Sequence, residues 1–213
     1  GESLPAERRR AGGLRSTLAA FRTLFGDRHF VGYAVASGLA FSAMFAYISG
    51  SPFVIQEIYG VSPQGFSLIF AVNAVGIVAA SQISGRLVGR VHPRRLMAMG
   101  IVGSLLGGLL LIAAVLAGAG LVGVLPAFFL AVASIGFIGP NATALGLAEQ
   151  PQDILGSASG LMGVLQFIIG AGVSPLVSAF GTASALPLGL TMALMSASAL
   201  AVFVTMTSAR AAR

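Results

Sequence analysis

Six long stretches without one charged side chain constrain the fold of this chain more than any other feature of its sequence. They run over about 30–51, 66–84, 96–117, 121–143, 156–180 and 184–206. A helix needs roughly 20 mostly apolar residues to cross the hydrocarbon core of a bilayer, so each stretch has the length of one membrane span. We therefore predict an all-α membrane protein with a bundle of six transmembrane helices over residues 30–206. Residues 1–29 are then a basic cytoplasmic linker, and residues 207–213 are a cytoplasmic tail.

The charged residues lie between the apolar stretches and are distributed asymmetrically. They make up 8% of the chain, against about 25% in a soluble domain, so we expect the lipid bilayer to surround this protein. All 12 basic residues are Arg, and they fall in the linker, the second connection and the tail, whereas the first, third and fifth connections have none. Cytoplasmic loops carry the excess of basic residues, so we predict a multi-pass protein with both termini in the cytoplasm. The charges do not gather on one basic face, and we expect no binding of nucleic acid.

Large amide side chains occur at four positions inside the apolar stretches. Asn73 and Gln82 belong to the second stretch, Asn141 to the fourth and Gln166 to the fifth, whereas the third and sixth carry only Ser and Thr. Polar side chains in a bilayer usually face the protein interior or a water-filled cavity. Each amide is therefore either an interhelical link, worth about 0.6 kcal/mol on average, or part of a cavity wall. The pattern predicts that the second, fourth and fifth helices face inward, while the third and sixth mostly meet lipid.

A cavity for a small molecule also needs apolar surface, because drug-sized ligands are held mainly by apolar and aromatic side chains. The first helix joins the inward set through its tyrosine and its phenylalanines. The candidate residues of a substrate cavity are Phe41, Phe45, Tyr47, Asn73, Phe137, Asn141, Gln166 and Phe167.

The first apolar stretch ends in a group of small residues and a proline. Proline disfavours helix at the preceding residue, and glycine permits a bend, so we predict an extracellular turn. It is either a gate-side turn between two cavity helices or an ordinary loop. Ser62 and Pro63 have the order of an N-cap and a first-turn proline at the start of the second helix, and Asp153 is expected to cap the fifth. The residues of the predicted turn are Ser49, Gly50, Ser51 and Pro52.

Glycines recur at helical spacing on two of the stretches. Gly103 and Gly107 lie on the third, and Gly156, Gly160 and Gly163 on the fifth. Such spacing lets helix backbones approach closely. We expect static close packing on the third stretch, whereas on the fifth a bending of the helix is the alternative.

Several classes of chemistry find no support in the sequence. There is no cysteine, which excludes disulfides and thiolate metal sites. The two histidines, His29 and His92, lie at the ends of apolar stretches, and no HExxH motif is present. We expect no metal site, no cofactor and no enzyme active site.

The second connection, "GRLVGRVHPRR" (85–95), resembles the cytoplasmic loop G-x-x-x-D-R-x-G-R-R of major facilitator transporters, in the weaker form that follows their eighth helix. Gly89 stands where that pattern has its acid. The resemblance implies Arg contacts to helix ends and neighbouring acids that hold an outward-facing state. The alternative is that these Arg residues only orient the chain in the membrane. The residues of the predicted gating motif are Gly85, Arg86, Arg90, Arg94 and Arg95.

Two longer segments are similar to the Bcr/CflA drug-resistance transporters. Residues 47–88 resemble the seventh and eighth helices of that family, and residues 156–177 resemble its eleventh. The resemblance implies that the chain is the C-terminal half (helices 7–12) of a twelve-helix drug/proton antiporter in a bacterial plasma membrane, paired with an N-terminal six-helix half. Such an antiporter exports small hydrophobic or amphipathic compounds by alternating access, and the proton motive force drives it.

Two other readings of the same features stay open. One is a carrier for the uptake or export of a polar metabolite on the same fold, and the other is a non-transporting fragment or scaffold. No carboxylate lies inside any of the six stretches. We therefore expect the groups that couple transport to protons in the other half, and no proton coupling by this chain alone.

Overall fold

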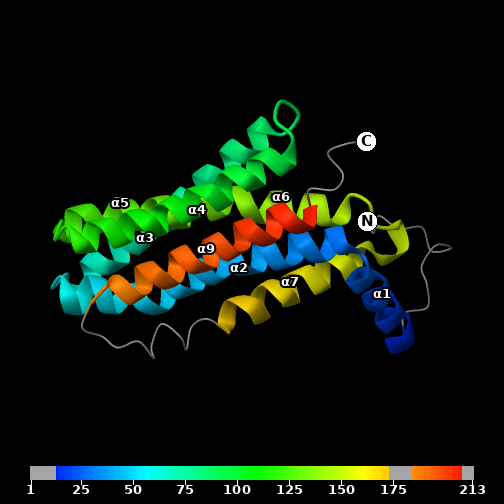
Figure 1. The fold of residues 1–213 in the computed structure, drawn as a ribbon, viewed down its shortest axis with the longest axis horizontal. Coiled ribbons are helices and arrows are strands. Elements are labelled where there is room, and N and C mark those ends of the chain that lie inside the picture. Colours follow the sequence, from blue (N-terminus) through cyan, green and yellow to red (C-terminus); the bar gives the residue numbers. More distant parts are fainter. Residues whose placement is uncertain (1–12, 173–183, 208–213) are drawn as a thin grey trace.

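Every regular element that the computed structural model describes is a helix (Figure 1). The structure describes residues 13–172 and 184–207. In chain order, the elements are α1 (Leu14–Gly26), α2 (Arg28–Pro52), the π-helix η2 (Phe53–Ile58), α3 (Pro63–Leu87), α4 (Pro93–Leu116), α5 (Gly120–Ala133), α6 (Ile135–Leu147), the short helix η3 (Gln152–Ile154), α7 (Leu155–Ala171) and α9 (Leu186–Thr207).

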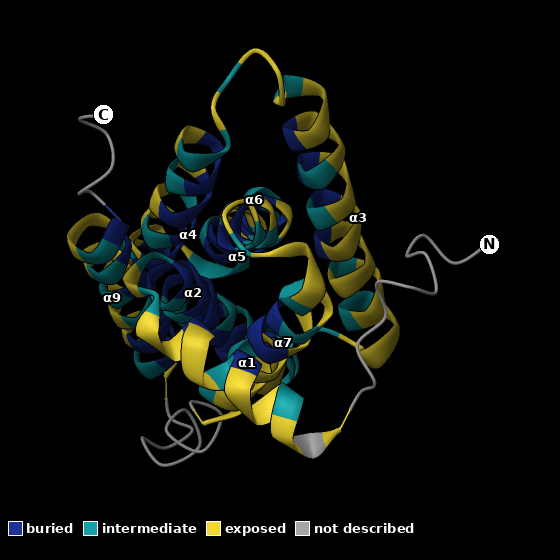
Figure 2. Cartoon of the chain, turned by 90° about the vertical axis from the view of Figure 1, so that its right-hand side faces the viewer, coloured by how far each residue is buried: buried dark blue, intermediate teal, exposed yellow. Residues whose placement is uncertain are grey.

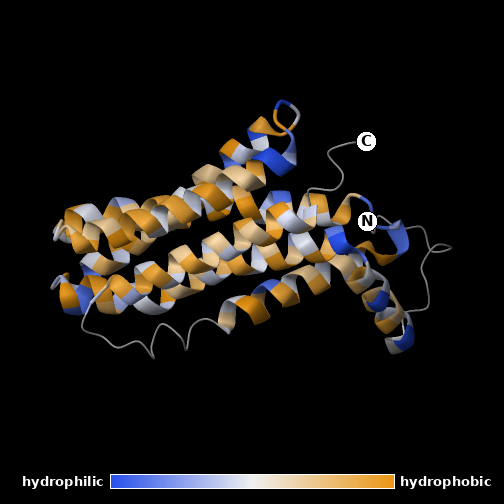
Figure 3. Cartoon of the chain, in the orientation of Figure 1, coloured by the Kyte–Doolittle hydropathy of each residue, from blue (hydrophilic) through white to orange (hydrophobic). Residues whose placement is uncertain are grey.

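The described residues contain six helical segments that are long and apolar enough to cross a membrane. Each overlaps one of the six predicted stretches, but the first continues to Ile58 and the fourth to Leu147. Residues 173–180 of the fifth stretch lie outside the described residues. The predicted all-α bundle of six membrane helices is thus confirmed. Polar residues gather at the end of the bundle that holds the α3–α4 loop and α1 (Figure 3). We call this end, which carries the Arg residues of the 85–95 loop, the basic end.

The predicted linker contains one helix that sequence reasoning treated as irregular chain. Leu14–Gly26 forms α1, which packs against α2 and α7. Asp27 ends α1 and is the N-cap of α2, because its carboxylate accepts hydrogen bonds from the backbone N–H groups of His29 (2.9 Å) and Phe30 (3.4 Å). The linker is therefore joined to the first membrane helix at Asp27, which ends α1 and caps α2.

The predicted turn at residues 49–52 is wrong, because the chain stays helical through these residues and up to Ile58. Pro52 is the last residue of α2, and the chain continues directly into η2. Proline removes one backbone donor, and the wider π-turns that follow pair the backbone groups again, for example Tyr59 N–H with the Val54 carbonyl at 3.3 Å. The turn comes at Gly60, whose φ of +68° favours glycine. As predicted, Ser62 then caps α3, accepting from the Gly65 N–H, with a proline in the first turn.

Helix α2 is largely buried and lies between α9 and α7, whereas α3 lies at the edge of the bundle (Figure 2). α2 packs most extensively on α9 and also contacts α7 and α6, while α4 packs on α5, α9 and α6. In the apolar windows of α3 and α7, 17% and 22% of the residues are buried, against 39% for α4, 44% for α9 and 61% for α2. Within this chain, the third and sixth spans are therefore more buried than the second and fifth. The predicted division concerns a cavity that a second six-helix body would complete, and it stays a prediction.

The fourth span is broken into two helices at Ser134. The Ser134 hydroxyl donates to the Leu130 carbonyl at 2.6 Å, and the Phe137 N–H bonds to the Ser134 carbonyl at 3.1 Å. The Ser134 hydroxyl thus competes with a backbone N–H for the Leu130 carbonyl. The i→i+3 bond of Phe137 is a tighter turn than that of an α-helix. Both features bend helices. α5 contacts mainly α4 and α3, whereas α6 contacts mainly α4, α2 and α3.

Glycines set the closest approaches between helices. A Cβ on Gly107 of α4 would lie 2.5 Å from the backbone nitrogen of Ala131 on α5, which confirms close packing on the third span. A Cβ on Gly136 of α6 would meet the backbone of α3, 2.7 Å from the nitrogen of Ser81. By contrast, a Cβ on Gly160 or Gly163 of α7 would have no neighbour within 4 Å. These α7 glycines face no other described part of the chain.

Candidate functional site

The tyrosine and the first amide of the predicted substrate cavity form a buried hydrogen bond between α2 and α3. The Asn73 side-chain nitrogen donates to the Tyr47 hydroxyl at 2.8 Å. The Tyr47 ring stacks on Phe70 at 6.0 Å between centroids and meets the edge of Phe128 at 5.2 Å. Both Tyr47 and Asn73 are buried. This contact joins α2, α3 and α5, and it favours the interpretation of Asn73 as an interhelical link.

Two further amides make links of the same kind. The Asn141 side-chain nitrogen on α6 donates to the Ser84 hydroxyl on α3 at 2.7 Å and to the Phe137 carbonyl, also at 2.7 Å. The Gln166 side-chain nitrogen on α7 donates to the Ser37 hydroxyl on α2 at 3.0 Å. Three of the four amides thus hold pairs of spans together through a hydroxyl acceptor.

Asn73 additionally borders a cavity, whereas Gln82 is exposed. The cavity has a volume of about 360 Å³ and lies between α3 and α5. Its lining is apolar apart from the amide, and consists of Leu68, Ile69, Val72, Asn73, Leu125, Pro126 and Phe129.

The predicted aromatic residues of the wall separate into two groups. Phe45 on α2 lies against Gly170 of α7, where a Cβ would come within 2.5 Å of its ring, and it meets Phe167 edge to face at 5.9 Å. Phe167 is 66% exposed. Phe41 and Phe137 are half-buried. Phe41 lies beside Gly139 of α6, and Phe137 packs with its Cβ close to Gly100 of α4. We call Phe45, Phe167 and Gln166 the α2–α7 wall.

The conformation of the basic loop explains why its sequence departs from the family pattern. Gly89 has a φ of +95°, a conformation that an L-residue such as Asp adopts only with strain. His92 is the N-cap of α4, accepting from the Arg94 N–H through its Nδ1 at 3.2 Å, and Pro93 follows in the first turn. At the position where the family pattern has an acidic residue, this loop has Gly89 in a conformation with positive φ.

The structure gives the Arg residues of this loop different surroundings. Arg86, Arg90 and Arg95 are exposed, and Gly85 has no neighbour within 4 Å of a Cβ. The Arg94 guanidinium contacts the last turn of α9. Its Nε and Nη2 donate to the Thr207 hydroxyl at 3.4 and 3.3 Å, and its carbon lies 5.3 Å from the centre of the Phe203 ring. Of the predicted motif, Arg94 makes the contact to a helix end that the resemblance implies.

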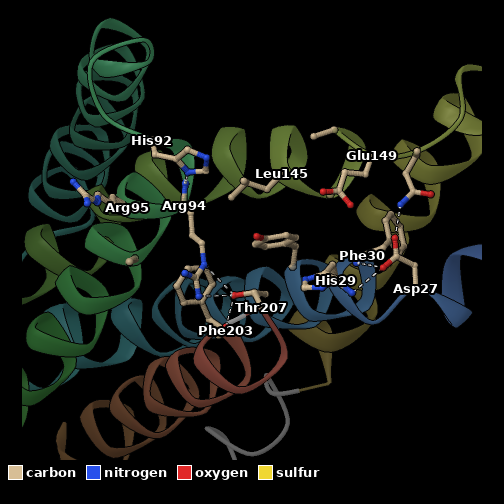
Figure 4. Close-up of a pocket in the computed structure, with 15 residues that line it drawn as sticks. Asp27, His29, Phe30, His92, Arg94, Arg95, Leu145, Glu149, Phe203 and Thr207 are labelled. Carbon is tan, nitrogen blue, oxygen red and sulfur yellow. Dashed lines mark hydrogen bonds between the residues drawn. The ribbon is translucent and has the colours of Figure 1, made fainter. Parts of the chain in front are cut away.

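A larger cavity, of about 680 Å³, opens at the basic end (Figure 4). It lies where α2 and α4 begin and where α6 and α9 end. Its polar lining combines acidic, basic and imidazole side chains with several aromatic rings. The lining residues are Asp27, His29, Phe30, Tyr33, His92, Arg94, Arg95, Ala98, Leu145, Gly146, Ala148, Glu149, Gln150, Phe203 and Thr207.

Asp27 lines this cavity and links two parts of the chain that surround it. Besides capping α2, its second carboxylate oxygen accepts from the Gln150 side chain at 2.8 Å, which ties α2 to the α6–α7 connection. Burial raises the pKa of the Asp27 carboxyl, but the hydrogen bonds from Gln150, from the His29 and Phe30 N–H groups, and the nearby His29 charge outweigh it, so the pKa lies below its ordinary value.

Sequence reasoning did not find several of these contacts. Asp153 was expected to cap the fifth helix, but the N-cap of α7 is Ile154, without a side-chain hydrogen bond, and Asp153 lies in η3. The buried pair of hydroxyls Ser104 and Ser196, 2.9 Å apart, joins α4 to α9, which were assigned no polar link. Isolated serines carry no signal for such a pair, since they occur throughout the chain.

Comparisons with known proteins give the chain its relatives. It matches the family model described as Major Facilitator Superfamily over residues 2–175. It is 35% identical over 191 residues to the Uncharacterized MFS-type transporter YdgK of Bacillus subtilis (strain 168), covering 90% of this chain and 47% of that protein. It is also 29% identical over 178 residues to the Bicyclomycin resistance protein homolog of Haemophilus influenzae, covering 81% of this chain and 43% of that protein. The chain therefore spans about half the length of the curated relatives it matches.

Proposed function

Because the chain belongs to the Major Facilitator Superfamily, we propose that it is the C-terminal half of a drug/proton antiporter that exports small hydrophobic or amphipathic compounds by alternating access. The superfamily consists of multi-pass membrane transporters, which agrees with the prediction that the chain is not an enzyme. The similarity to a bicyclomycin resistance homolog supports the proposed class of substrate.

The observation that carries the proposal is the α2–α7 wall. It offers the exposed Phe167 ring, its partner Phe45 and one amide, Gln166, and α7 is one of the two least buried spans of the described chain. Apolar and aromatic surface with few polar groups is the lining that drug-sized ligands use. The Asn73, Asn141 and Gln166 amides already donate to hydroxyls of neighbouring helices. This favours amphipathic compounds over the alternative of a polar metabolite.

A second six-helix body is the proposed partner of the open faces of α3 and α7. Gly156, Gly160 and Gly163 meet no other described residue, and α3 and α7 have the smallest buried shares of the six spans. Small-residue faces let membrane helices approach closely. The relatives are about twice as long as this chain. We infer that an N-terminal half packs on these faces and completes the substrate cavity.

Proton coupling is assigned to that other half. Of the described acids, Asp27 and Glu149 lie in connections, and Asp153 lies in η3, in the first turn of the fifth span. Glu57 is an exposed residue of η2 at the very end of the first span. We therefore propose that the proton motive force drives the complete transporter and that this chain alone moves no protons.

The proposed orientation puts the basic end in the cytoplasm. Arg15, Arg22 and Arg28 lie at the same end of the bundle as the 85–95 loop (Figure 1), and basic residues are retained on the cytoplasmic side. Both termini are then cytoplasmic, and because the relatives are bacterial proteins the membrane is the bacterial plasma membrane.

Export is tested with the complete protein that contains this chain, in bacteria that lack their own drug exporters. Bicyclomycin accumulation should fall relative to cells without the protein. Phe167→Ala should reduce the export rate about tenfold, because one aromatic contact of about 1.5 kcal/mol is lost. Leu194→Ala, which truncates an exposed side chain of α9, is the matched control and should leave export unchanged. Equal accumulation with and without the protein would refute the proposal.

A further inference from the structure

The apolar cavity of about 360 Å³ between α3 and α5 lies in the half of the bundle away from the basic end (Figure 1). Its α3 residues belong to the first half of that helix, and α5 is the half of the fourth span that is far from the 85–95 loop. Among the described residues, its lining has none in common with the α2–α7 wall or with the cavity at the basic end. It is therefore separate from both.

Asn73 is the polar side chain of this lining, and it is only 3% exposed. Its nitrogen donates to the Tyr47 hydroxyl at 2.8 Å, which fixes the orientation of the amide. The Asn73 Oδ1 accepts no hydrogen bond from any residue in the described part of the chain, and protein atoms do not enclose it. An amide oxygen has two lone pairs, and buried polar atoms are nearly always hydrogen-bonded. The cavity thus presents one free acceptor within an apolar lining.

An aromatic ring lies beside this acceptor. The Phe129 ring of α5 packs on Gly76 of α3, where a Cβ would come within 2.7 Å of the ring. Gly76 follows Asn73 by three residues and so lies on the same face of α3, one turn further along. The absence of a side chain at Gly76 therefore brings the Phe129 ring close to the amide. An aromatic surface next to one hydrogen-bonding group is typical of sites for small aromatic ligands.

We propose that this cavity binds an aromatic compound with one hydroxyl or N–H donor, with the donor on the Asn73 Oδ1 and the ring against Phe129. Its volume is at the small end of the range for drug-sized ligands, about 300–1,000 Å³. A lipid acyl chain is equally apolar, but it has no donor and would leave the amide oxygen unpaired, which is unfavourable in apolar surroundings. The site does not depend on the proposed export, because this chain alone contains it.

Equilibrium dialysis of the full 213-residue chain in lipid nanodiscs tests the site, with naphthol as the probe. Empty nanodiscs of the same lipid correct for partition into the bilayer. Naphthol should bind about tenfold more tightly than its methyl ether, because the ether has the same rings but cannot donate to the amide oxygen. Binding no greater than that of empty nanodiscs, or an affinity for the ether equal to or above that for naphthol, would overturn the proposal.

Two substitutions of valine on α3 test the location. Val72 lines the cavity and is 51% exposed, so Val72→Phe should fill the cavity and abolish naphthol binding without disturbing the bundle. Val75 is 66% exposed on the same helix and lies outside the lining, so Val75→Phe is the matched control and should bind naphthol normally. Unchanged binding in Val72→Phe, or equal losses in both variants, would contradict the site.

The double variant Tyr47→Phe with Asn73→Leu tests the amide itself. Replacing both partners of a buried hydrogen bond by apolar groups of similar shape leaves stability nearly unchanged, and the melting temperature of the variant checks this. Without the Asn73 oxygen, naphthol and its methyl ether should bind with equal affinity. A tenfold preference for naphthol that persists in a folded double variant would refute the role of Asn73.

Discussion

Adding one methyl group at Gly136 or at Gly160 should change the stability of this chain in opposite directions. At Gly136 on α6, a Cβ would press on the backbone of α3, at the Ile77 carbonyl and 2.7 Å from the Ser81 nitrogen. Backbone atoms cannot rotate away, so the helices must separate, and overpacking of this kind costs about 3 kcal/mol at its upper end. The higher helix propensity of alanine relative to glycine stabilises the folded chain by about 1 kcal/mol. The net loss at Gly136→Ala is about 2 kcal/mol.

At Gly160 on α7, the methyl group enters open space and meets no described atom within 4 Å. Gly160→Ala should therefore stabilise the isolated chain by about 0.4–1 kcal/mol, through helix propensity and the unfolded state alone.

Thermal unfolding of the purified chain in detergent measures both effects. For a domain of this size, about 2–4 °C of melting temperature corresponds to 1 kcal/mol, so Gly136→Ala should lower the midpoint by about 4–8 °C and Gly160→Ala should raise it by up to about 4 °C. In the complete transporter, Gly160→Ala should instead destabilise, because the other half packs on this face. Equal midpoints for the two variants of the isolated chain would refute the assignment of one buried and one open glycine face.

Three further predictions concern the links between helices. Asp27→Asn keeps an N-cap but removes the charge; because the folded pKa of Asp27 is depressed, its stabilisation is complete above the unfolded pKa of about 3.9 and disappears as the pH falls through the folded pKa. The stability difference between the unaltered chain and this variant should stay constant above about pH 5 and shrink toward pH 3 in chemical denaturation. A double-mutant cycle of Ser104→Ala and Ser196→Ala should give a coupling of about 0.6 kcal/mol, and zero coupling would contradict the bond between α4 and α9. Arg94→Gln should lower the melting temperature through the lost cation–π and hydroxyl contacts, worth about 1 kcal/mol, whereas Arg90→Gln should not.

The spans were predictable from the sequence because the bilayer imposes their length. Each uncharged stretch of about 20 residues could satisfy its backbone only as a helix. Local capping was predictable where a side chain of the right type met a proline, as at Ser62 and Pro63. The same local reasoning failed at Pro52, because proline penalises only one hydrogen bond and the π-turns of η2 absorb that loss.

The partners of the polar residues could not be predicted from the sequence. Asn73 and Asn141 were identified as inward-facing, and they are buried, but the choice between link and cavity depended on the hydroxyls of Tyr47 and Ser84, which lie on other helices. Burial of the third and sixth spans depended on how α4, α9 and α2 pack together, which no single stretch encodes. The pairing of Arg94 with the end of α9 joins residues 113 positions apart.

The intact mass of the polypeptide extracted from its native membrane tests the central claim most directly, namely that this six-helix chain is one half of a two-body exporter. The account predicts a single polypeptide of about twice the 21.4 kDa of this chain. A native polypeptide of 21.4 kDa with no second six-helix chain bound to it would contradict the account.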